Sequence, residues 1–221
     1  MYKMGKLKII FILSLLVGWC LSGKEKIKLP FPSYKSNVSV EEALKKRRSI
    51  RKYEKSPLTL KELSQILWAV DGKTADWGGR TAPSAGATYP LEIFVVVRNV
   101  ESLKPGLYHY DSKNHSIKLV KARDFSDELC SFCLNQVFVK KDAFNIIIAA
   151  EFERTTAYYR KRGEMYVLLE AGHAAQNVYL QAIALSLGTV SVGAFYDNLV
   201  KETLNLPENE EPLYIMPVGR K

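Results

Sequence analysis

Residues 81–90 read TAPSAGATYP and run directly into the apolar segment 91–97, LEIFVVV. Two prolines flank three small residues at the centre of this loop, so it combines a stiff backbone with almost no side-chain bulk. Such a backbone at the start of a strand lets a flat ligand approach closely. The same composition is also typical of an ordinary tight turn, and the loop alone leaves both interpretations open.

A second informative segment lies upstream. Ser39 and Glu42 have the spacing of a capping box, which predicts a helix over residues 39–47. Cations at the end of this helix suit the helix dipole, but planar guanidinium groups also match a phosphate dianion, with a serine as neutral donor. The residues concerned are Arg47, Arg48, Ser49 and Arg51.

Two further segments follow, GTVSVGAF at 188–195 and MPVGRK at 216–221. These four segments, in this order, resemble the nitroreductase family of FMN-dependent oxidoreductases. The likeness is greatest to its SagB-type branch, the dehydrogenases associated with thiazole and oxazole peptide synthesis, and it covers about residue 38 to the C-terminus. It implies an α+β, nitroreductase-like fold, in which helices flank a central mixed, mainly antiparallel sheet.

The resemblance also implies an FMN held mostly by one subunit. Arg47 and Ser49 match positions that reach the phosphate and the ribityl chain, with Arg48 beside them. Arg51 matches a cationic position beside the flavin pyrimidine, where positive charge stabilises the anion formed on reduction. The other expected cofactor-binding residues are Pro83, Ser84, Ala85, Gly86 and Ala87 over the flavin edge, Gly193 and Ala194 facing flavin N5, and Arg220 at the phosphate.

Tyr159 is the candidate catalytic residue. Because the flavin itself passes the hydride, an acid or base in the chain is optional, and packing against the pocket wall is the alternative role for Tyr159. Azoline-oxidising relatives carry a Lys-Tyr pair before the long helix. Here Tyr158 takes the place of the lysine, and Lys161 is out of register. This difference favours a small-molecule or peptide substrate other than a peptide azoline.

Residues 164–187 predict the longest helix, which is apolar nearly all round and is expected to be closed by Gly188. A helix of this kind must be buried on every face. In a chain of 221 residues this indicates a subunit interface, in agreement with the homodimers that the resemblance implies. His173, within this helix, is expected to be a core residue.

The remaining elements follow from local patterns. Thr59 and Glu62 form a second capping box, followed by a helix with one apolar face. Cys130 and Cys133 are expected in a short helix over 124–134, as idle thiols or as a disulfide or redox pair; no metal site is expected. Strands are expected at 91–98, 107–110, 116–120, 143–150, 190–195 and 212–218.

The N-terminus reads as a targeting segment. Lys3, Lys6 and Lys8 precede an apolar run over 9–21, which is shorter than the roughly 20 residues that a membrane-spanning helix needs. Residues 1–23 are therefore expected to be a secretory signal peptide or an N-terminal membrane anchor, with lipidation at Cys20 less favoured. The protein would then be periplasmic, extracellular or membrane-attached. Residues 24–37 are expected to be a linker, and 38–221 the FMN-binding domain.

The charge pattern agrees with a phosphorylated cofactor. The net charge is +9, and its clustered part lies in residues 45–55, without any nucleic-acid-binding motif, so nucleic acid is not expected as a partner. The resulting hypothesis is an FMN-dependent oxidoreductase, with NAD(P)H as a candidate electron donor. Two alternatives stay open: a non-catalytic flavin-binding or maturation protein outside the cytoplasm, and a flavin-free interaction module.

Overall fold

The computed structural model describes residues 26–221, so the expected leader, 1–23, lies outside the described residues. Within 26–221, no helix combines the length and the apolar character needed to cross a bilayer. The domain is built on one seven-stranded sheet in which all neighbouring strands run antiparallel. In order across the sheet, the strands are β1 (Lys26–Lys28), β4 (Ser116–Lys121), β3 (Gly106–Asp111), β2 (Leu91–Val97), β5 (Phe144–Glu151), β7 (Glu210–Arg220) and β6 (Leu187–Thr189).

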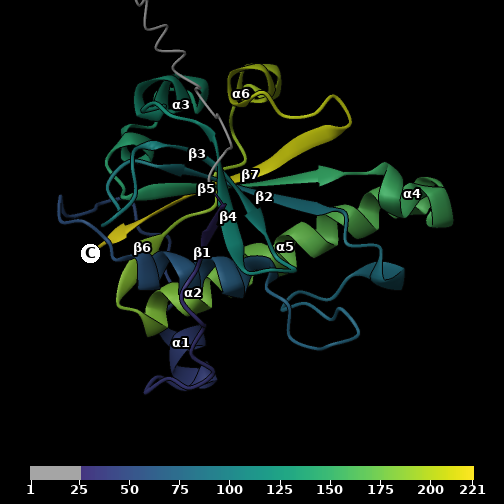
Figure 1. The fold of residues 1–221 in the computed structure, drawn as a ribbon, viewed down its shortest axis with the longest axis horizontal. Helices are drawn as coiled ribbons and strands as arrows, with labels where there is room; N and C mark the ends of the chain where they lie inside the picture. The colour runs from purple at the N-terminus through teal and green to yellow at the C-terminus, as the bar shows by residue number, and fades with distance from the viewer. Residues whose placement is uncertain (1–25) are drawn as a thin grey trace, which may run out of the picture.

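Helices cover both faces of this sheet, with α2 and α5 on one side and α3 and α6 on the other (Figure 1). This arrangement confirms the expected α+β, nitroreductase-like fold. The α-helices are α1 (Val40–Lys46), α2 (Leu60–Asp71), α3 (Ser126–Phe132), α4 (Glu153–Tyr159), α5 (Lys161–Ala184) and α6 (Asp197–Leu204); η1 (Ala85–Ala87) and η2 (Val137–Lys140) are short 3-10 helices.

Strand β2 shows why the sheet needs helices on both faces. Successive side chains of a strand point to opposite faces, and those of β2 are almost all apolar. Ile93 and Val95 pack into the core beneath α2 and α5, while Phe94 and Val96 pack into the core beneath α3 and α6. A strand that is apolar on both sides must be buried on both sides. The central strand β5 follows the same rule.

Helix α2 begins where its sequence predicts. The hydroxyl of Thr59 accepts a hydrogen bond from the backbone N–H of Glu62 at 3.2 Å, and the Glu62 carboxylate accepts one from the backbone N–H of Thr59 at 2.8 Å. This capping box satisfies donors that the first helical turn leaves free. The apolar face of α2 is fully buried, as expected, through Leu63, Ile66, Leu67 and Val70.

The long helix differs from its prediction in two respects. It ends at Ala184 and not at 187, because Ser186 takes a left-handed φ of 58° and turns the chain into β6. Gly188 is therefore a strand residue and not the end of the helix. A Cβ at Gly188 would lie 2.6 Å from Cγ2 of Ile50, so glycine allows the segment after α1 to pack against this strand.

The burial of α5 is one-sided within one chain. Its inner face packs on the sheet and on α2, but Met165, Leu168 and Leu169 are 44%, 53% and 52% exposed. His173, expected in the core, is also exposed, because it lies on this outer face. The single chain therefore does not bury every face of α5 and leaves an apolar strip of the helix uncovered, while its burial in a homodimer stays a prediction.

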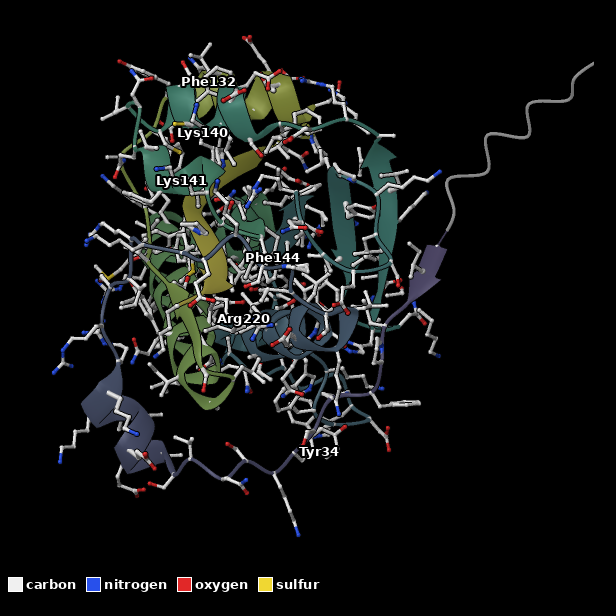
Figure 2. All side chains as sticks on the ribbon, turned by 90° about the vertical axis from the view of Figure 1, so that its left-hand side faces the viewer. Tyr34, Phe132, Lys140, Lys141, Phe144 and Arg220 are labelled. Atoms are coloured by element: carbon white, nitrogen blue, oxygen red, sulfur yellow. The ribbon has the colours of Figure 1, made fainter. Side chains whose placement is uncertain are left out.

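Part of the expected linker, 24–37, belongs to the folded domain. Strand β1 pairs with β4, Leu29 is buried, and the backbone N–H of Ser33 donates to Oε1 of Gln65 at 2.7 Å. The ring of Tyr34 lies 5.5 Å from that of Trp68. Figure 2 shows Tyr34 at the end of the molecule opposite to the end where Phe132 and Lys140 lie. These are contacts between segments far apart in sequence, which the polar composition of 24–37 does not indicate.

The capping box gives a first prediction. Thr59→Ala should lower the free energy of unfolding by about 1 kcal/mol, since the first turn of α2 loses its hydroxyl acceptor. Urea denaturation measures this change. Thr74→Ala, at an exposed threonine, is the matched control and should change stability by less than about 0.5 kcal/mol. Equal stability of Thr59→Ala and the unchanged protein would show that the cap contributes nothing.

Candidate functional site

The basic segment after α1 is fastened to the edge of the sheet. Helix α1 ends as the backbone N–H of Arg47 donates to the carbonyl of Ala43 at 2.9 Å. The chain then becomes extended, and the N–H of Ile50 donates to the carbonyl of Thr189 in β6 at 2.9 Å. This contact places residues 47–51 beside β6 and beside the C-terminal half of α5.

The basic residues Arg47, Arg48 and Arg51, together with Ser49, are called the arginine cluster below. Tyr179 of α5 is the residue of the helix that this cluster contacts. The guanidinium carbon of Arg47 lies 5.1 Å from the centroid of its ring. Its hydroxyl accepts a hydrogen bond from the backbone N–H of Ser191 at 2.8 Å, and it lies 3.3 Å from the hydroxyls of Ser49 and Ser191. Burial opposes ionisation, but the hydrogen bonds from Ser191 and Ser49 and the charge of Arg47 together lower the pKa of Tyr179. Three segments distant in sequence thus meet at one phenol.

The three arginines of the cluster form no ion pair with any residue of the described range 26–221. Arg48 donates only to the backbone carbonyls of Lys45 and Arg47, at 3.1 and 2.7 Å. Arg51 is exposed, and its guanidinium carbon lies 5.7 Å from the centroid of the Phe138 ring. The cluster therefore concentrates positive charge that the described part of the chain does not compensate.

Gly193 and Ala194 lie close to the same cluster. Val192 forms an isolated bridge with Ile215 of β7, through hydrogen bonds of 2.8 and 3.0 Å, and this bridge is all that remains of the strand expected at 190–195. Gly193 and Ala194, which follow, are exposed. A Cβ at Gly193 would meet only the Tyr214 ring, at 3.7 Å, so the backbone here is open to a ligand.

Arg220, which was expected at the phosphate, forms an ion pair within the chain. At the end of β7 (Figure 2), its Nη2 lies 3.1 and 3.2 Å from the two carboxylate oxygens of Glu62. It also donates to the carbonyl of Pro57, at 3.4 Å. The charge of Arg220 is therefore already compensated by the residue that caps α2.

The loop at 83–87 forms the short helix η1 with left-handed backbone at Gly86, φ 60°, and Ala87, φ 54°. The hydroxyl of Ser84 accepts a hydrogen bond from the N–H of Tyr89 at 2.9 Å. The hydroxyl of Thr88 lies 2.7 Å from that of Thr155. The loop is thus held to itself and to α4, as a stiff and small-residue loop is expected to be.

Tyr159, the candidate catalytic residue, packs against this loop. A Cβ on Gly86 would lie 2.7 Å from the Tyr159 hydroxyl, so only glycine permits this contact. The ring of Tyr159 meets that of Tyr166 edge-on, with centroids 5.1 Å apart. Tyr159 is 37% exposed. Its phenol therefore lies against the loop and remains accessible from solvent.

Buried carboxyl groups lie behind the loop. Asp71, 3% exposed, pairs with Arg80 at 2.6 Å and accepts a hydrogen bond from Ser112 at 2.7 Å. Burial raises its pKa to about 6, although Arg80 and Ser112 oppose this shift. Glu170 of α5, also 3% exposed, has its pKa raised by burial to about 7, against the opposing hydrogen bond with Ser84. Neither the pairing of Asp71 with Arg80 nor that of Glu170 with Ser84 could be predicted from the spacing of these residues in the sequence.

The predicted residues thus form two groups that the single chain keeps apart. The arginine cluster contacts α5 at Tyr179, whereas the loop and Tyr159 contact it at Glu170 and Tyr166. Nine residues of helix separate Glu170 from Tyr179, or roughly 14 Å. Two pockets in the described part of the chain have volumes of about 920 and 680 Å³. Neither is lined by Arg47, Ser49 or Gly193. In one chain the expected cofactor residues form an open surface.

The two cysteines of the described range 26–221 are free thiols. Cys130 and Cys133 are 4% and 0% exposed. Burial raises the pKa of both, that of Cys133 to about 12, so both are neutral at pH 7. No group of three or more metal-ligating side chains occurs in residues 26–221.

Comparison with known proteins places this chain in a family. The model of the Nitroreductase family matches residues 44–220. A protein of Methanocaldococcus jannaschii, provisionally named a nitroreductase, is 52% identical over 184 residues, which cover 83% of this chain and 92% of that protein. A crystal structure from Ralstonia eutropha, with the same provisional name, is 31% identical with a TM-score of 0.78, and the match covers 90% of this chain and 91% of that chain.

A more distant relative points to a branch. The microcin B17-processing protein McbC of Escherichia coli is 28% identical over 146 residues, which cover 63% of this chain and 54% of McbC, so this chain spans about half of McbC. The chain belongs to the nitroreductase family, as its sequence predicts, and its relatives include McbC of the SagB-like branch.

Proposed function

We propose that the protein is an FMN-dependent oxidoreductase that passes electrons through a bound flavin, with NAD(P)H as the first donor to test. The observation that carries the proposal is the cluster of Arg47, Arg48 and Arg51 without an ion-pair partner in the described chain, beside the hydroxyls of Ser49 and Ser191. Guanidinium forks and hydroxyl donors together fit a phosphate monoester at the edge of a sheet.

The residues present fit FMN in chemical type. Arg47 and Ser49 would hold the phosphate and the ribityl chain, and the exposed backbone at Gly193 leaves room for a ring system. Bound FMN would supply the two-electron chemistry that no side chain of the cluster can supply. Arg51 would place positive charge beside the ring and so favour its reduced form.

A second subunit would bring the two groups together. The exposed strip Met165, Leu168 and Leu169 lies on the turns of α5 that also carry Tyr166 and Glu170, and apolar surface of this kind is typical of a subunit interface. If two α5 helices pack antiparallel about a two-fold axis near Leu169, the N-terminal end of α5 in one chain, next to Tyr159, faces the part of α5 that carries Tyr179 in the other. Tyr159 and the loop of the partner subunit would then cover a flavin held by Arg47 and Ser49. This modifies the expectation that one subunit holds most of the FMN.

Within such a site, the chain's own groups have separate roles. The Tyr159 phenol would be near the covered ring and able to donate a hydrogen bond to a substrate. Glu170 can keep its proton near pH 7 and hold Ser84 in place. A neutral carboxyl behind the loop is compatible with a negatively charged ring nearby.

Two alternatives give different outcomes. A non-catalytic flavin-binding or maturation protein would bind FMN but would not be reoxidised by any added acceptor at a useful rate. A flavin-free module would not bind FMN. We also propose export or membrane attachment through residues 1–23, which mass spectrometry of the mature N-terminus and cell fractionation would test.

Substitution of Arg47 and of Arg51 should affect the flavin in different ways. The protein should purify with about one FMN per subunit, and Arg47→Ala should lose the flavin, because the phosphate dianion is left under-compensated. Arg51→Ala should retain much of the FMN but lower its reduction potential; a tenfold change in the equilibrium, about 1.4 kcal/mol, is roughly 30 mV for two electrons. Absorbance spectra and redox titration measure both effects. Equal FMN loss in both variants, with an unchanged potential, would show the roles to be wrongly assigned.

The shared site gives a prediction about assembly. Leu169→Glu should convert the dimer to a monomer and weaken FMN binding at least tenfold, because the covering loop belongs to the partner. Light scattering and fluorescence titration with FMN measure the two effects. Leu199→Glu, at a 41% exposed leucine of α6, is the control and should change neither. A monomeric variant with unchanged FMN affinity would refute the shared site.

Glu170 should make stability depend on pH. Its pKa rises from 4.5 to about 7 on folding, so the folded chain holds the proton more tightly. This contribution to stability is present at low pH and is lost as the pH rises through 7. Relative to Glu170→Gln, the unchanged protein should therefore lose roughly 2 to 3 kcal/mol between about pH 4.5 and 8. Urea denaturation at several pH values measures this, and parallel pH curves would contradict it.

A further inference from the structure

The corner between α4 and α5 carries an exposed basic and aromatic surface. Arg160, Lys161 and Arg162 follow one another there, and Tyr158, immediately before Tyr159, is 77% exposed. None of the three cations forms an ion pair within residues 26–221. The preceding cation, Arg154, is by contrast fully engaged, at 2.6 Å from both Glu92 and Glu151.

The backbone at this corner is tightly constrained. Arg160 has a left-handed φ of 52° with ψ −142°, which breaks the helix between Tyr159 and Lys161. A Cβ on Gly163 would lie 2.8 Å from the Cα of Thr156, so the two helices meet at close range. The N–H of Gly163 donates to the carbonyl of Arg160 at 2.9 Å. The side chains of residues 160–162 remain exposed at this rigid turn.

This surface adjoins the loop proposed to cover the flavin. Tyr159 touches Gly86, and Tyr166 contacts Tyr159 on one side and lies 5.6 Å from the guanidinium carbon of Arg162 on the other. The aromatic rings thus link the loop to the cations. A planar substrate reaching the loop would pass a surface that attracts negative charge.

On the basis of the proposed function, we propose that residues 160–162 select a planar redox substrate that carries negative charge, such as a carboxylate, sulfonate or phosphate. Both an electron acceptor and a nicotinamide nucleotide donor can have this chemistry. When the acceptor is a quinone, it gains two electrons and two protons to become a hydroquinone. The FMN returns to its oxidised form, and NAD(P)H or dithionite supplies the next two electrons.

Two matched pairs of probes distinguish the sources. The acceptor pair is 1,4-naphthoquinone-2-sulfonate and neutral 2-methyl-1,4-naphthoquinone, mixed anaerobically with photoreduced holoprotein in a stopped-flow instrument. The donor pair is NADPH and neutral 1-benzyl-1,4-dihydronicotinamide, mixed with oxidised holoprotein. In the variant Lys161→Glu/Arg162→Glu, the rate with at least one anionic probe should fall about tenfold or more, while both neutral probes change less than twofold.

Controls separate charge from folding. Lys113→Glu/Lys118→Glu makes the same change of charge at exposed lysines of the β3–β4 hairpin and should leave all four rates unchanged. In the unchanged protein, raising the ionic strength from about 10 to 200 mM should slow the anionic probe selectively, a test that needs no variant to fold. Equal sensitivity of charged and neutral probes in both tests would overturn the proposal.

Calorimetric titration of the protein with the sulfonated quinone keeps this inference separate from the flavin proposal. Binding that weakens with salt and in the double variant supports an anion-binding surface at residues 160–162 even if the protein takes up no FMN. A flavin-containing protein whose affinity for the sulfonate is unchanged in the variant would overturn the inference and leave the flavin proposal standing.

Discussion

The packing of α5 along the sheet is the contact on which the rest of the structure depends. Its inner face, with Val167, Ala171, Ala174 and Val178 all buried, closes the core beneath β2 and β5. Small side chains in the middle of this face allow the helix to lie close to the strands. Because the same helix carries Glu170 near its middle and Tyr179 nearer its C-terminal end, its position fixes both groups of functional residues. A shift of α5 would displace the loop and the arginine cluster together.

The features that sequence predicts well are local. The caps at Ser39 and Thr59 and the apolar face of α2 each depend on residues within one or two turns of helix. The buried strand at β5 and the hairpin of β3 and β4 likewise follow from short apolar patterns. Agreement between local preference and the final fold is expected of a sequence with one stable structure.

The features that sequence misses depend on distant partners. Tyr179 is one tyrosine in an apolar helix, and its role becomes visible only where Ser49 and Ser191 meet it. Strand β1 lies in a polar segment and exists because β4 offers an unpaired edge. Arg220 was expected at the phosphate from its terminal position, and its ion pair with Glu62, far away in sequence, could not be read from any local pattern. A signal for Tyr179 was present, since a polar group on the inner face of a buried helix requires a hydrogen-bond partner.

Gly188 has a consequence for how such a protein could change over generations. It is not among the expected cofactor-binding residues, yet its missing side chain allows Ile50 to pack against β6, and Ile50 lies between Ser49 and Arg51. Even a methyl group at this position would displace Ile50 and with it the extended segment that bears the arginines. Selection for tighter or weaker cofactor binding could therefore act on Gly188, although Gly188 is not part of the expected binding surface. Substitutions of this glycine without effect on the protein should be rare.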